Sequence, residues 1–95
     1  MQKRVHIVVS GRVQGVGYRA SACDKAKSLG ITGWVRNLPE GAVEILAEGD
    51  KPSMEAFIDW CAIGPRWARI DDVQVSDEVP KEDSSGYRVF YIKYF

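Results

Sequence analysis

The sequence has few of the residues that build disulfide frameworks, metal sites and membrane spans. It has two cysteines among 95 residues, Cys23 and Cys61, and they form no Cys-x-x-Cys pair. Both fall in segments that we expect to be helical, so we interpret them as buried thiols. The one histidine, His6, lies inside an apolar segment and is assigned no role. No segment approaches the roughly 20 consecutive apolar residues of a membrane-spanning helix, so we expect no membrane partner.

The charges show no excess of either sign. The chain has 13 Lys and Arg residues and 13 Asp and Glu residues. Because a nucleic-acid-binding protein usually carries a basic excess, we expect no nucleic-acid partner. The distribution is uneven, since residues 1–23 contain cations and no acid, whereas residues 71–83 are strongly acidic. A local basic stretch still permits the capture of one small anion.

The length and the N-terminus bear on organisation and location. The length of 95 residues and the apolar fraction of 45% predict one globular domain over residues 1–95. Lys3 and Arg4 precede an apolar run at residues 5–9, but this run is too short for a signal peptide and His6 interrupts it. We therefore expect a cytoplasmic protein.

Two apolar periodicities alternate along the chain. Segments rich in branched or alternating apolar residues predict strands over residues 3–10, 31–38, 42–48, 69–76 and 87–95. Apolar residues at helical spacing predict helices over residues 19–29 and about 52–63. The order is βαββαβ with one further strand. It predicts an α+β fold, a ferredoxin-like sandwich with both helices on one face of a mainly antiparallel sheet of four to five strands.

Two strand segments carry special features. Alternation in the fourth segment slips at Asp71 and Asp72, and a β-bulge accounts for such a slip. The last segment is strongly aromatic, and we assign most of its aromatic side chains to core packing. These aromatic residues are Tyr87, Phe90, Tyr91, Tyr94 and Phe95.

A glycine-rich loop separates the first strand from the first helix. Residues 11–17 contain three glycines, which allow backbone angles that other residues avoid. A helix start leaves N–H groups unpaired, and the helix dipole adds partial positive charge there. Such groups form a concave site suited to phosphate. We expect the backbone of this loop to bind substrate, and the residues concerned are Gln14, Gly15, Val16, Gly17, Tyr18 and Arg19.

Arg19 stands at the start of that helix. Its guanidinium is permanently charged and can hold two phosphate oxygens at once, which a lysine cannot do. No Gly-Lys-Ser/Thr follows, so this is no Walker loop, and the third glycine of a dinucleotide-binding fingerprint is missing. Taken alone, these residues leave open a turn that merely allows tight packing.

Asn37 lies near the end of the second predicted strand, before the turn Pro39-Glu40-Gly41. A neutral amide has two donors and an acceptor, so it can hold a water molecule without repelling phosphate. Position alone favours an asparagine that stabilises the turn.

At this point the sequence resembles the acylphosphatase family. Residues 11–19 (GRVQGVGYR) and 33–41 (GWVRNLPEG) are similar to its two motifs, and the resemblance covers essentially the whole chain. Tyr18 is a mild departure, because phenylalanine is common there. The resemblance implies hydrolysis of the carboxyl-phosphate bond of acyl phosphates. It also implies that Arg19 binds phosphate and that Asn37 positions the attacking water.

The expected chemistry needs no cofactor and no metal ion. The leaving carboxylate is a weak base, and phosphoryl transfer is mostly positioning and charge stabilisation. The water's proton can pass to a substrate oxygen. We interpret the carboxylates of residues 71–78 as a solvated strand edge, because the loop spacing of a hard-cation site is missing. We expect a monomer that inorganic phosphate or sulfate inhibits competitively.

Two alternatives remain open. An RNA-binding sheet of the same fold needs aromatic residues on its central strands, and residues 5–10 have none. A regulatory or carbamoyl-phosphate-handling domain would keep the loop without free turnover. Hydrolysis of benzoyl phosphate by the purified chain separates these readings.

Overall fold

The computed structural model of the chain describes residues 2–79 and 88–94. Strands and helices alternate along this part of the chain. In chain order they are β1 (Gln2–Arg12), α1 (Tyr18–Ser28), β2 (Thr32–Asn37), β3 (Val43–Asp50), α2 (Lys51–Cys61), β4 (Arg69–Glu78) and β5 (Phe90–Ile92). This order confirms the predicted βαββαβ arrangement and the additional strand.

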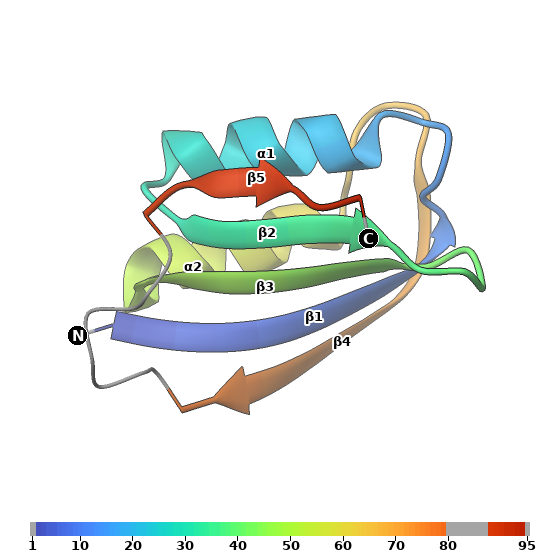
Figure 1. Cartoon of the computed structure of the whole chain (residues 1–95). Coiled ribbons are helices and arrows are strands. Elements are labelled where there is room, and N and C mark those ends of the chain that lie inside the picture. The colour runs from blue at the N-terminus through green and yellow to red at the C-terminus, as the bar shows by residue number, and fades with distance from the viewer. Residues whose placement is uncertain (1, 80–87, 95) are drawn as a thin grey trace.

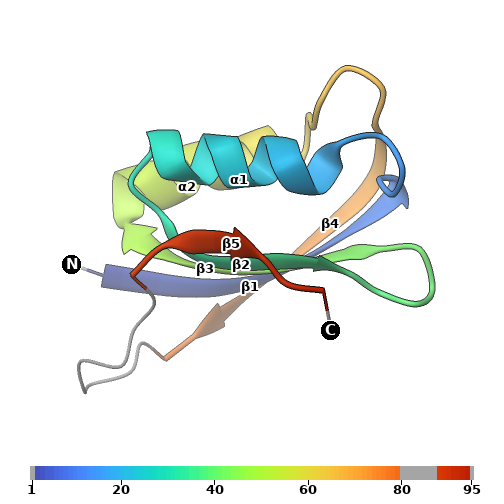
Figure 2. The same ribbon diagram turned by 45° about the horizontal axis from the view of Figure 1, so that its top comes forward.

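The strands form one sheet with the order β4-β1-β3-β2-β5. β1 pairs antiparallel with β3 and β4, β2 pairs antiparallel with β3, and β5 joins β2 in parallel. Both helices lie on the same face of this sheet, and the opposite face carries no helix (Figures 1 and 2). The prediction of a mainly antiparallel, ferredoxin-like sandwich is confirmed.

The core lies between the sheet and the two helices. Alternate residues of β1 are buried and face alternate residues of β3, because side chains along a strand point to opposite faces. Ile7 is paired with Ile45 and neither side chain is exposed. From α2, Phe57 is fully buried, and its ring packs edge-on against Phe90 of β5 at 5.9 Å. Apolar burial of this kind is the main force that holds the two layers together.

The predicted irregularity in the fourth strand is confirmed. Ser10 of β1 pairs with Asp72, whereas Gly11 pairs with Ile70, so Asp71 has no partner in the ladder and forms a bulge. Both cysteines are buried and free, as the sequence predicted. No helix in the described ranges is long and apolar enough to cross a membrane.

The last strand is shorter than predicted. β5 covers Phe90–Ile92, and the segment expected to extend over residues 87–95 includes Tyr87 and Phe95, which lie outside the described residues. Phe90 is in the core, but Tyr91 is 39% exposed and Tyr94 is 77% exposed. Core packing was therefore the wrong explanation for Tyr94. The loop predicted at residues 80–86 also lies outside the described residues.

Candidate active site

The glycine-rich loop connects the end of β1 with the start of α1 (Figure 1). Gly15 and Gly17 adopt φ angles of 75° and 80°, in the left-handed region that favours glycine. Gly17 is the N-cap of α1, and no side chain caps this helix end. Among the described residues, no acceptor receives a hydrogen bond from the backbone N–H groups of residues 14–19. The loop thus presents unpaired donors at the positive end of a helix dipole.

Part of this loop lines a cavity of about 250 Å³. Of the residues predicted to bind substrate, four line it, namely Gly15, Gly17, Tyr18 and Arg19. The remaining lining residues come from the neighbouring segments and are Val13, Ala20, Ile92 and Tyr94. Gln14 and Val16 do not line the cavity, and Val16 packs against the core instead.

The Gln14 side chain has a role that the sequence did not indicate. Its Nε2 donates hydrogen bonds to the carbonyl oxygens of Leu38 at 2.8 Å and Ala42 at 2.9 Å. Both carbonyls belong to the turn between β2 and β3, which follows Asn37. Gln14 therefore fixes the loop against the turn that directly follows Asn37, the second residue predicted to be catalytic.

The Tyr18 side chain anchors the start of α1 in the core. It is 1% exposed, and its hydroxyl donates a hydrogen bond to the Cys61 carbonyl at 2.9 Å. Its ring lies 5.3 Å from the Trp60 ring. Burial strongly raises the pKa of Tyr18, and burial also raises the pKa of Cys61 to about 12. Both groups therefore stay neutral near pH 7, and the Tyr18 side chain is held in the core.

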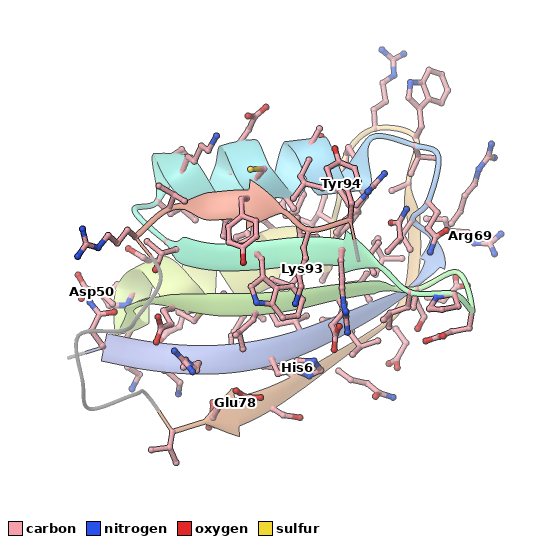
Figure 3. The ribbon with its side chains drawn as sticks, in the orientation of Figure 1. His6, Asp50, Arg69, Glu78, Lys93 and Tyr94 are labelled. Carbon is pink, nitrogen blue, oxygen red and sulfur yellow. The ribbon has the colours of Figure 1, made fainter. Side chains whose placement is uncertain are left out.

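The Arg19 guanidinium lies over the ring of Tyr94, 5.4 Å from its centre. No carboxylate of the described residues forms an ion pair with it. Its positive charge is therefore not neutralised within this part of the chain. Tyr94 lies just beyond β5, near the N-terminal end of α1, where the glycine-rich loop joins this helix (Figure 3).

Asn37 is the last residue of β2 and lines a second cavity of about 540 Å³ with Arg36, Leu38, Pro39 and Tyr94. Its Oδ1 atom is buried and accepts no hydrogen bond from any described residue. A buried polar atom without a partner is unfavourable unless a ligand or water molecule satisfies it. The Oδ1 atom of Asn37 is therefore available to accept a hydrogen bond from a water molecule or a ligand.

The structure places Arg19 and Asn37 on two adjoining cavities, and Tyr94 lines both. The sequence analysis missed Tyr94 as a site residue. No pattern in the sequence distinguished Tyr94 from the other aromatic residues of the last segment, because the period of two would place its ring with Phe90 in the core, whereas the residue is 77% exposed.

An ionic cluster lies next to the Asn37 cavity. Arg36 donates through Nε to Glu44 of β3, and a hydrogen bond of 2.6 Å joins the other Glu44 oxygen to Nε2 of His6. Burial acts to raise the pKa of Glu44, but the hydrogen bonds from His6 and Arg36 outweigh it and keep the pKa below its ordinary value. His6 therefore has a structural contact where none was predicted.

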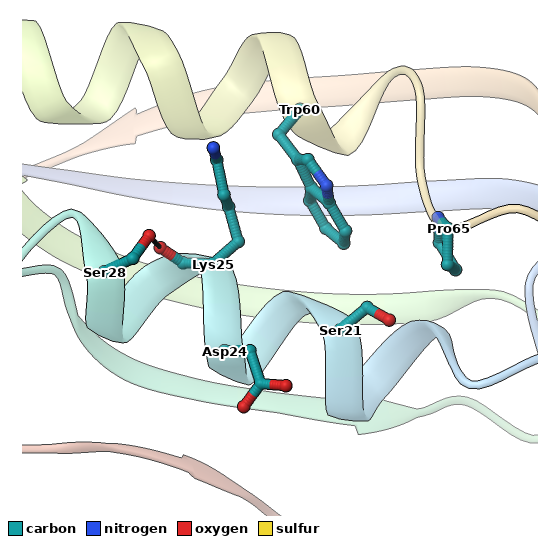
Figure 4. Close-up of a pocket in the computed structure, with 6 residues that line it drawn as sticks. All are labelled: Ser21, Asp24, Lys25, Ser28, Trp60 and Pro65. Atoms are coloured by element: carbon teal, nitrogen blue, oxygen red, sulfur yellow. Dashed lines mark hydrogen bonds between the residues drawn. The ribbon is translucent and has the colours of Figure 1, made fainter.

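A third cavity, between the two helices, is a separate feature (Figure 4). Its volume is about 340 Å³. Ser21, Asp24, Lys25 and Ser28 of α1 line it, opposite Trp60 and Pro65. Ser28 donates its hydroxyl hydrogen bond to the Lys25 carbonyl of its own helix at 2.7 Å. None of the predicted site residues lines this cavity, so we assign it no part in the chemistry.

Comparison with known proteins gives one consistent result. The family model described as acylphosphatase matches residues 5–89. The chain is 59% identical over 75 residues to an acylphosphatase of Methylococcus capsulatus, covering 79% of this chain and 82% of the relative. It is 50% identical over 90 residues to an acylphosphatase of Trichormus variabilis, covering 95% and 85%. A solved acylphosphatase from Coxiella burnetii superposes with a TM-score of 0.89 at 36% identity, covering 97% of this chain and 93% of that one.

Proposed function

The chain belongs to the acylphosphatase family and is an acylphosphatase, and we propose that the loop of residues 14–19, Arg19 and Asn37 form its active site. The enzyme hydrolyses the carboxyl-phosphate bond of acyl phosphates to a carboxylate and inorganic phosphate. What remains to be assigned is the part that each residue plays. The proposal is supported by one observation: Tyr94 lines both the cavity of the unpaired loop donors and Arg19 and the cavity of Asn37, whose Oδ1 has no partner among the described residues.

In this proposal the phosphoryl group occupies the cavity beneath the loop. Backbone N–H groups of Gly15, Gly17 and Tyr18 point donors at the phosphoryl oxygens, and the N-terminal end of α1 adds its dipole. Arg19 holds two oxygens with its planar fork. Because these donors are already in place, they stabilise the charge that spreads over the equatorial oxygens in the transition state without reorganising.

Asn37 has the complementary task of placing the nucleophile. Its Oδ1 accepts a hydrogen bond from a water molecule and so directs the water oxygen toward the phosphorus. The water oxygen forms the new P–O bond while the bond to the carboxylate oxygen breaks and its electron pair leaves with the carboxylate. The water's proton passes to a phosphoryl oxygen, so no protein base is required.

Two alanine variants test these roles in the purified chain. Arg19→Ala is expected to lower kcat/KM for benzoyl phosphate by roughly 10²–10³, because a preorganised donor is lost. It also weakens competitive inhibition by inorganic phosphate. Asn37→Ala is expected to lower kcat while the phosphate inhibition constant changes little, because it leaves the loop and Arg19 intact.

Arg66→Ala is the matched control, since Arg66 is an exposed arginine that stacks on Trp67 and lines neither cavity. It is expected to behave as the wild type. Kinetics like those of the wild type in both Arg19→Ala and Asn37→Ala would show that the reaction takes place elsewhere on the molecule.

A further inference from the structure

We propose that Tyr94 is a positioning residue that orients the Arg19 guanidinium for the incoming phosphoryl group. This inference rests on the proposed function, because it assumes that Arg19 binds phosphate. It goes beyond that function by naming the residue that orients the Arg19 guanidinium before substrate binds. The carrying observation is that one ring contacts Arg19 at 5.4 Å and lines both the loop cavity and the Asn37 cavity.

The backbone beside Tyr94 is firmly held although its ring is exposed. β5 pairs with β2 up to Ile92, and the Lys93 N–H continues this pairing by donating to the Val35 carbonyl at 2.8 Å. The Lys93 ammonium also lies 4.6 Å from the centre of the Trp34 ring. The Tyr94 ring itself is 77% exposed. Core burial therefore does not explain where this ring lies, whereas the contact with Arg19 does.

An aromatic ring suits this task better than a carboxylate. A guanidinium that lies over a ring is attracted by the π-electrons, and its in-plane N–H groups remain directed outward. A carboxylate would occupy those N–H groups and neutralise the charge, so it would compete with the substrate. In the described part of the chain Arg19 has no carboxylate partner. The ring thus orients the Arg19 side chain and leaves its guanidinium N–H groups available to bind phosphate.

The location between the two cavities adds a second constraint. Ile92 and Tyr94 both line the loop cavity, and of these two only Tyr94 also lines the Asn37 cavity. Without the ring, the guanidinium can swing into the space in front of Asn37. Phosphate binding must then restrict a mobile arginine, which weakens binding. Once phosphate is bound, it orients the guanidinium itself, so the chemical step is little changed.

The test compares Tyr94→Leu with Tyr94→Phe and Tyr94→Trp. Tyr94→Leu is expected to raise the phosphate inhibition constant and the KM for benzoyl phosphate about 2- to 5-fold, the equivalent of one exposed cation–π contact. Its kcat stays within about twofold, since uniform binding is what has been lost. Both aromatic variants retain the wild-type constants. Equal behaviour of Tyr94→Leu and Tyr94→Phe, or a fall confined to kcat, would overturn the positioning role.

Tyr91→Leu serves as the control, because Tyr91 is on the same edge strand and lines neither cavity. It is expected to leave both constants unchanged; an equal loss of affinity would mean that the edge strand is generally disturbed and would refute the inference. Thermal unfolding of each variant confirms that it folds.

An Arg19→Gln background separates this inference from the proposed function. Phosphate binding is followed by NMR titration of the loop amides, which also reports weak binding. Arg19→Gln is expected to weaken binding, and Tyr94→Leu added to it is expected to have no further effect. If Arg19→Gln does not weaken binding, the proposed site is wrong. If it does, while Tyr94→Leu alone leaves binding unchanged, the site stands and the role of Tyr94 is wrong.

Discussion

Gln14 shows how a single side chain can link two segments of the proposed active site. Its amide donates to two carbonyls of the β2–β3 turn, and Ala42 O also accepts the Leu38 N–H at 2.8 Å. Gln14→Met keeps the length of the side chain and removes both donors. The loss is expected to lower the free energy of unfolding by about 1–3 kcal/mol, because two hydrogen bonds worth roughly 0.5–1.5 kcal/mol each are removed. The substitution also leaves the distance between the loop and Asn37 less firmly fixed.

The kinetic consequence of Gln14→Met follows from this less firmly fixed distance between the loop and Asn37. Misplacement of the water relative to phosphorus is expected to lower kcat roughly 10- to 100-fold, with a smaller change in the phosphate inhibition constant. Urea unfolding and steady-state kinetics measure the two effects. Gln74→Met is the control, since Gln74 is exposed on β4. A Gln14→Met enzyme with normal kcat would show that the turn does not depend on this contact.

At the scale of single residues, the resemblance to the acylphosphatase family, and not residue type or position, identified the candidate catalytic residues. Residue type and position alone also allowed a packing turn around Arg19 and a turn-stabilising role for Asn37, and the catalytic roles stay a prediction; the two residues line two cavities that share Tyr94. The side-chain role of Gln14 was not predictable, because its partners are 24 and 28 residues away. Tyr94 was missed because an aromatic residue at a strand end looks the same whether its ring enters the core or leaves it.

At the scale of elements, the start of α1 depends on the backbone of Gly17. A φ of 80° at the N-cap is accessible to glycine, and an alanine there is strained by about 1–2 kcal/mol. Relief of this strain moves the N–H groups that the proposed phosphate site needs. Gly17→Ala is therefore expected to weaken phosphate inhibition roughly 3- to 10-fold in addition to lowering stability.

Gly30 supplies a matched control at the opposite end of the same helix. Its φ is 72°, and a Cβ at either glycine meets no atom within 4 Å. Gly30→Ala is expected to lose a similar amount of stability and to keep the wild-type inhibition constant. The measurements are urea unfolding and phosphate inhibition of both variants. Equal weakening of phosphate inhibition in both would mean that global stability, not the helix start, controls the site.

The order of the helices and strands and the bulge in β4 were predictable, because the spacing of apolar residues along the sequence indicates both directly. Slipped alternation at Asp71 and Asp72 indicated the bulge, and the β1–β4 register confirms it. The length of the last strand was not predictable in the same way. β5 is an edge strand and ends at Ile92 although its partner β2 continues to Asn37, so neither the apolar pattern nor the length of the partner sets its end.

At the scale of the whole molecule, the face of the sheet without helices is held by charged side chains. Glu44 joins three strands, because it lies on β3 and binds Arg36 of β2 and His6 of β1. Its side chain is only 16% exposed. Since these contacts lower the pKa of Glu44 in the folded state, the ionised form stabilises the fold. That stabilisation is present above the ordinary glutamate pKa of about 4.3 and is lost as the pH falls through the lowered value.

Glu44→Gln tests this pH dependence across the sheet. At pH 7 the variant is expected to be less stable than the wild type by about 1–3 kcal/mol, because hydrogen bonds to a charged group are replaced by weaker ones. As the pH falls below about 4, the wild type loses its advantage and the two free energies of unfolding converge. Urea unfolding at a series of pH values measures the difference. Glu40→Gln, at an exposed position in the β2–β3 turn, is expected to show a small difference with little pH dependence. A Glu44→Gln difference that stays constant down to pH 2 would mean that packing, not charge, makes Glu44 stabilising.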